Sequence, residues 1–145
     1  MLPTTRKNNF NILGKNYGFA RQEKLKSVVK IDRLFTGGRS FWMYPFGVHY
    51  RIYNEDDGAA CQLLVSVGKH FFKHAVDRNR IKRLVREAYR LNKSALVDAV
   101  SKSGVHLDFG LVYKSKQIPD YKTVETAVKQ ILERLADMAG KVDFS

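Results

Sequence analysis

The sequence predicts one α+β domain over residues 21–145, in which helices cover a small sheet of about four strands. Two periodicities predict this class. Apolar residues recur at helical spacing in the stretches at residues 22–35, 77–91 and 119–140. Aromatic and β-branched residues dominate the extended stretches at residues 39–53, 61–67 and 105–113. The resulting order is α-β-β-β-α-β-α, and its strand-helix-strand crossover, which carries the second helix, implies one parallel strand pair.

The chain begins with residues 1–20, which are polar and aperiodic and which we interpret as a flexible basic extension. A first helix is expected over residues 22–35, and Gly37-Gly38 ends it. The apolar stripe of this helix comprises Leu25, Val28, Val29, Ile31, Leu34 and Phe35.

The composition of residues 39–53 is typical of extended structure. Pro45 and Gly47 interrupt this run, so we expect one or two extended segments with an irregularity between them. The second segment places on one face Phe46, Val48, Tyr50 and Ile52. After a turn signal at residues 54–58, residues 61–67 predict another strand, and we expect the two to pair as a hairpin. About half of the aromatic residues in this region are expected in the core, and the exposed half would be able to stack on nucleobases. The sequence does not assign the individual residues to these two sets, whose members are Phe41, Trp42, Tyr44, Phe46, Tyr50 and Tyr53.

The second helix has one apolar arc and one cationic arc, with Asp77 as its expected N-cap. The apolar arc comprises Ile81, Leu84, Val85, Ala88 and Leu91. The opposite arc comprises Asn79, Lys82, Arg83, Arg86 and Arg90. A strand then follows at residues 105–113, and Pro119-Asp120 opens a last helix that runs to Gly140. Its buried stripe is expected to contain Val124, Ala127, Val128, Ile131, Leu132, Leu135 and Met138.

The charge of the chain is strongly positive and unevenly distributed. The formal net charge is +12, and residues 69–92 hold eight Lys or Arg against two acids. A charge run is often only a solvated helix face. Here Glu87 is the only acid in the helix after the cap, so ion pairs within the helix cannot neutralise its cationic face. Lysine and arginine side chains one turn apart therefore repel each other, at a cost of roughly 0.2–0.5 kcal/mol per pair. A polyanionic partner that relieves this repulsion is the better explanation.

Other function classes find little support in the sequence. No stretch is long and apolar enough to span a membrane, and we expect a cytoplasmic protein. The only cysteine, Cys61, opens a strand-like run and is expected to be a buried structural thiol. His70 and His74 lie four residues apart, but no Cys or spaced acid completes a metal site. The common catalytic motifs of hydrolases, metalloproteases and nucleotide-binding enzymes are absent from the sequence.

One block closely resembles the signature of the protein subunit of bacterial ribonuclease P. It comprises residues 64–67, Lys69 and residues 75–89, and the triplet Arg78-Asn79-Arg80 is its most specific part. The helix at residues 25–35, followed by Thr36-Gly37-Gly38-Arg39-Ser40, also resembles the first helix of that family. The likeness covers about residues 24–138.

The resemblance implies a ribonucleoprotein that removes the 5′ leader of precursor tRNA, with the chemistry on a catalytic RNA subunit. It implies one protein per RNA, magnesium on the RNA subunit, no cofactor on the protein and no catalytic residue in this chain. The RNA-facing residues that it implies are Arg78, Asn79, Arg80, Lys82, Arg83, Arg86 and Arg90. A cleft between the first helix and the sheet would hold the leader, with Phe35, Tyr50 and Lys69 as candidates. Ile31 replaces an aromatic residue that is common in the family.

Three rival functions share parts of this pattern. A ribosomal or other structural RNA-binding module would have the same charge and fold without a processing role. A helix-turn-helix that binds DNA is disfavoured by the strand-rich context. A protein-only nuclease is least expected, because the sequence shows no set of carboxylates for catalytic metal ions.

Overall fold

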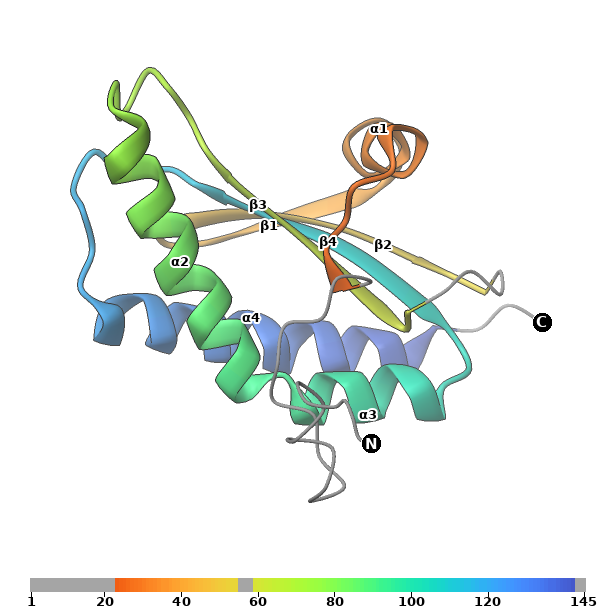
Figure 1. The fold of residues 1–145 in the computed structure, drawn as a ribbon. Helices are drawn as coiled ribbons and strands as arrows, with labels where there is room; N and C mark the ends of the chain where they lie inside the picture. Colours follow the sequence, from red (N-terminus) through yellow and green to blue (C-terminus); the bar gives the residue numbers. More distant parts are fainter. Residues whose placement is uncertain (1–22, 55–58, 143–145) are drawn as a thin grey trace, which may run out of the picture.

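A computed structural model describes residues 23–54 and 59–142 of the chain. The predicted α+β class is confirmed: four helices and a four-stranded mixed sheet are present in the described residues (Figure 1). The predicted extension at residues 1–20 lies outside them. The elements in chain order are α1 (Val28–Gly37), β1 (Arg39–Met43), β2 (Phe46–Tyr53), β3 (Cys61–Val67), α2 (Ala75–Asn92), α3 (Ser94–Lys102), β4 (His106–Tyr113) and α4 (Tyr121–Lys141).

The strands lie in the order β1-β2-β4-β3. β1 and β2 form an antiparallel hairpin, β2 pairs antiparallel with β4, and β3 pairs parallel with β4. The parallel pair predicted from the crossover is therefore confirmed. The predicted hairpin between β2 and β3 is wrong, because β4 lies between them. β4 is buried on both faces, from Leu107 to Leu111, which suits it to the centre of the sheet.

The two faces of the sheet are covered unequally. Among the described elements, α2, α3 and α4 pack on one face, whereas α1 is the single helix on the other face (Figure 1). The main core lies under the three helices, where alternate residues of β4 and the apolar stripe of α4 belong to one buried cluster. On the opposite face, α1 buries only Leu34, and Val28 and Val29 of the predicted stripe are exposed. Much of this face is therefore not covered by residues 23–54 and 59–142.

The first helix begins later than predicted. Ser27 is its N-cap, with its hydroxyl accepting a hydrogen bond from the Lys30 amide at 3.3 Å. Leu25 instead follows the β3 edge, where its amide donates to the carbonyl of Leu63 at 3.0 Å. This pairing covers part of an edge strand that would otherwise expose unpaired backbone groups.

The helical region after β3 consists of two helices rather than one, with the break at Lys93. The Lys93 ammonium is buried and forms a salt bridge to Glu23 at 2.7 Å, which ties the break to the chain before α1. Asp77 is not the N-cap: the N-cap is His74, three residues earlier, so Asp77 lies within the first turn of α2. An acid there still favours the positive end of the helix dipole.

The last helix follows the prediction closely. The Asp120 carboxylate caps it by accepting a hydrogen bond from the Thr123 amide at 2.8 Å. Its buried stripe contains six of the predicted residues, but Met138 is only partly buried and Ala139 is buried instead. The helix continues one residue past Gly140, to Lys141.

Candidate nucleic-acid interface

The cationic arc of α2 faces outward along the whole helix. Ile81, Val85 and Ala88 are fully buried and fix the orientation of the helix on the sheet and on α4. Asn79, Arg80 and Arg83 are exposed on the opposite side. Lys82, Arg86 and Arg90 lie on the same outer surface and are partly exposed. The sequence pattern alone predicted this orientation.

Most of these charges are not neutralised within the described residues. No ion pair there involves Arg80, Lys82, Arg83 or Arg86. Arg90 differs, because its guanidinium donates to both carboxylate oxygens of Glu87, at 3.0 and 2.7 Å. This hydrogen bonding lowers the pKa of the Glu87 carboxyl. A shallow groove on this surface is lined by Asn79, Arg83, Arg86, Glu87 and Arg90.

Arg78 lies at the flank of the helix and has an internal role. Its Nη1 donates to the carbonyl oxygens of Phe72 at 2.8 Å and Lys73 at 2.9 Å. These bonds hold the connection between β3 and the first turn of α2. Of the seven residues predicted to face RNA, Arg78 and Arg90 are thus also engaged within the chain.

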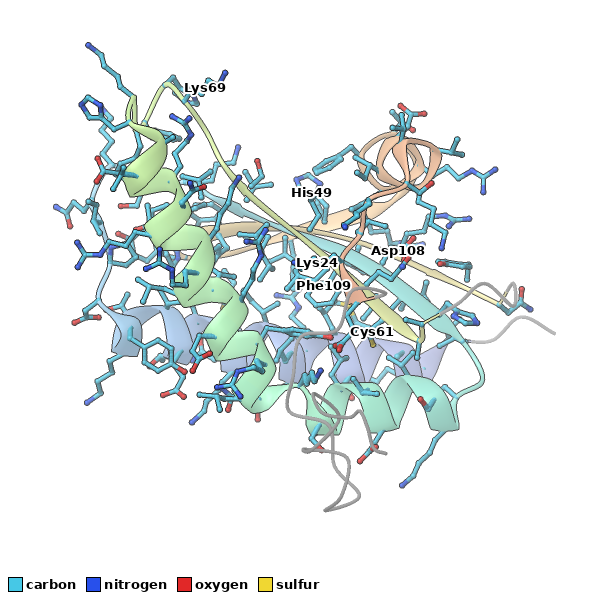
Figure 2. The ribbon with its side chains drawn as sticks, viewed as in Figure 1. Lys24, His49, Cys61, Lys69, Asp108 and Phe109 are labelled. Atoms are coloured by element: carbon cyan, nitrogen blue, oxygen red, sulfur yellow. The ribbon has the colours of Figure 1, made fainter. Side chains whose placement is uncertain are left out.

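A second surface lies on the open face of the sheet, beside α1. The rings of Phe35 and His49 are in contact, with centroids 4.8 Å apart, and Phe35 remains 42% exposed. α1 lies directly over Gly110, since a Cβ at that position would be in van der Waals contact with Leu34 Cδ2 at 3.4 Å and with Phe35 Cζ at 3.5 Å. Burial, and secondarily the charge of Lys114, lowers the pKa of His49. Figure 2 shows His49 and Asp108 projecting from the sheet toward α1, and Phe109 projecting toward the other helices.

The three residues predicted for the leader cleft do not lie together. Tyr50 points to the opposite face of the sheet from Phe35, where it contacts Phe41 with ring centroids 5.9 Å apart. Lys69 is exposed in the connection before α2, well separated from His49 (Figure 2). His49 takes the position beside Phe35 and was missed. The alternation that groups Phe46, Val48, Tyr50 and Ile52 on one face already places His49 on the other, and so contained the signal.

The structure also places the two spaced histidines and the cysteine that the sequence singled out. Within residues 23–54 and 59–142, no three His, Cys, Asp or Glu side chains are grouped as metal ligands. His70 contacts the ring of Phe71 at 4.0 Å between centroids, and His74 precedes α2. Cys61 is buried as predicted, and burial raises the pKa of its thiol to about 12, which keeps it in the unreactive neutral form. None of the described helices has the length and apolar character needed to cross a bilayer.

Together, the outward cationic helix and the half-covered sheet define a class: a small basic α+β protein suited to a polyanionic partner. The family model of ribonuclease P matches residues 19–136, which is most of the chain. The chain belongs to the ribonuclease P protein family.

Individual relatives agree with this membership. The chain is 41% identical over 120 residues to the ribonuclease P protein component of Porphyromonas gingivalis, covering 83% of this chain and 88% of that protein. The solved ribonuclease P protein of Thermotoga maritima is similar in fold, with a TM-score of 0.60 and 26% identity over 77% of this chain and 96% of that one. The Staphylococcus aureus protein has the same fold, with a TM-score of 0.60 and 22% identity over 77% of this chain and 94% of that one.

Proposed function

We propose that this protein is the protein component of a ribonuclease P, and that it assists a catalytic RNA in removing the 5′ leader of precursor tRNA. The outward face of α2 carries the proposal, because four cations there lack an ion pair within the described residues. In this proposal Arg80, Lys82, Arg83 and Arg86 neutralise phosphates of the catalytic RNA, and Asn79 and Arg90 border the same groove.

The open face of the sheet supplies the second part of the proposal. Phe35, with His49 against it, offers a partly exposed aromatic surface on which an unpaired leader base stacks. Tyr50 is left out of this surface, because it points to the other face of the sheet. The protein thereby positions the substrate, while magnesium and the chemistry belong to the RNA subunit.

Reconstitution tests the whole proposal. The purified full-length protein is added to a bacterial ribonuclease P RNA at low magnesium, and leader cleavage of precursor tRNA is followed. We expect cleavage at least about tenfold faster than with the RNA alone, since each aligned contact worth about 1.4 kcal/mol changes a rate or equilibrium tenfold. RNA binding without stimulation would identify a structural RNA-binding module instead. Cleavage by the protein in the absence of the RNA subunit would indicate a protein-only nuclease.

Phe35→Ala tests the leader site specifically. The substitution removes a stacking surface worth roughly 1–3 kcal/mol, so we expect binding of leader-bearing precursor tRNA to weaken about tenfold. Affinity for mature tRNA should be almost unchanged, as measured by filter binding to the reconstituted complex. Val28→Ala is the matched control, because Val28 lies on the same helix and is 81% exposed. Equal losses for precursor and mature tRNA would exclude Phe35 from the leader site.

A further inference from the structure

Two exposed aromatic residues stand at the far end of the β1–β2 hairpin. Trp42 is 55% exposed and Tyr44 is 64% exposed, and their rings form an edge-to-face pair with centroids 6.3 Å apart. Neither belongs to the core. Large exposed aromatic residues that are grouped usually mark a contact surface rather than chance exposure.

Trp42 lies on the same face of the sheet as the Phe35–His49 contact. Its cross-strand partner is Gly47, and Gly47 is two residues from His49 along β2, so the pleat turns all three positions toward the α1 side. Diagonal neighbours on one sheet face are about 7–8 Å apart, a distance that long aromatic side chains bridge. The surface beside Phe35 therefore continues over β2 to the hairpin tip without passing through the core.

The ammonium group of Lys114 lies between Trp42 and the Phe35–His49 contact. Among the described residues, a Cβ on Gly47 would meet the side chain of Lys114 alone, at 3.5 Å from Cε, so the Lys114 side chain lies over the backbone of Gly47. The same ammonium is near enough to His49 to lower its pKa. Lys114 is exposed and is in no ion pair with another described residue. In a single-stranded nucleic acid, bases stack on aromatic side chains and phosphates bind cations. A cation with aromatic residues on both sides therefore offers both kinds of contact along one strand.

We propose that Trp42, Tyr44 and Lys114 form a second binding site for single-stranded RNA, continuous with the Phe35–His49 surface, which holds the distal nucleotides of the leader. This inference rests on the proposed function, because it extends the same leader path. Phe35 and His49 hold the nearer nucleotides, Lys114 contacts a phosphate, and a distal base stacks on Trp42. The protein would thus favour precursors with longer leaders.

The test uses the reconstituted complex and precursor tRNAs that differ only in leader length. With the wild-type protein, affinity should rise with leader length. Trp42→Ala should weaken the binding of long-leader precursors about tenfold and leave the affinity for short-leader precursors unchanged. Trp42→Phe should retain most of the affinity for long leaders. Lys114→Gln should weaken long-leader binding and reduce its salt dependence, whereas Lys102→Gln, at an exposed lysine of α3, should do neither.

Fluorescence gives a direct readout, because Trp42 is the only tryptophan of the chain. We expect quenching when a long-leader precursor is added, and no change with the RNA subunit alone or with a short leader. Quenching by the RNA subunit alone would assign the site to that RNA and overturn the leader assignment.

The two proposals fail in different ways. If Phe35→Ala weakens all leader-bearing substrates but Trp42→Ala behaves as wild type at every length, only the distal site is refuted. If neither substitution has an effect, the leader path itself is refuted.

Discussion

Replacing Arg83 and Arg86 together with alanine should weaken binding to the ribonuclease P RNA by about a hundredfold at about 150 mM salt. Both side chains line the same groove on α2, and neither is in an ion pair with a described residue. A hydrogen bond to a charged group contributes roughly 1.5–3 kcal/mol, and two such contacts amount to about two decades in affinity. The log–log slope of affinity against salt should also become shallower by about two.

The controls separate charge, geometry and location. The double substitution to lysine keeps the charge but loses the planar fork of arginine, so it should recover only part of the affinity. Lys102→Ala removes an exposed cation from α3 and should leave binding within about twofold of wild type. Loss of affinity in Lys102→Ala equal to that of the double variant would mean that net charge, not α2, governs binding. Unchanged affinity in the double variant would exclude α2 as the RNA contact.

Helix periodicity predicted the parts of the structure that depend on one element at a time. The burial of Ile81, Val85 and Ala88 and the exposure of Arg83 follow from the spacing of apolar residues alone. Strand neighbours could not be predicted in the same way. β2 and β3 are consecutive along the chain and resemble a hairpin, but the more completely buried β4 takes the central place between them. The central position goes to the strand that buries the most apolar surface on both of its faces, and this depends on how the whole sheet is covered.

In the candidate site, too, features set by a single element were predicted, and features that depend on several segments were not. The outward arc of α2 was predicted, because a helix surface is a local property. The internal bonds of Arg78 to Phe72 and Lys73 depend on how the preceding connection folds back, which periodicity does not encode. Tyr50 was assigned to the leader cleft through the family resemblance, although the two-residue repeat of its own strand places it with the core. The position of Tyr50 in the sheet follows from this alternation, whereas its proposed contact with the leader stays a prediction.

Gly38→Ala should destabilise the protein by about 2–3 kcal/mol, the cost typical of forcing an extra methyl group into a packed site. A Cβ at this position would lie 2.4 Å from the carbonyl oxygen of Leu34 and 2.8 Å from that of Tyr50. Both atoms are backbone, so neither moves without displacing α1 or β2. The extended conformation of Gly38 is open to any residue, so the cost is steric. Urea unfolding should show a lower midpoint with an unchanged m value.

Gly37→Ala is the matched control for this substitution. Gly37 is the last residue of α1, and apart from its chain neighbours and its own helix backbone no heavy atom of a described residue lies within 4 Å of the position that its Cβ would take. Alanine there should be neutral or stabilising by up to about 1 kcal/mol, because it favours the helix more than glycine does. Relief of the clash at Gly38 requires α1 to move off the sheet, which also separates Phe35 from His49. Gly38→Ala should therefore weaken binding of leader-bearing precursor tRNA, whereas Gly37→Ala should not. Wild-type stability and leader binding in Gly38→Ala would show that α1 does not pack on the sheet in this way.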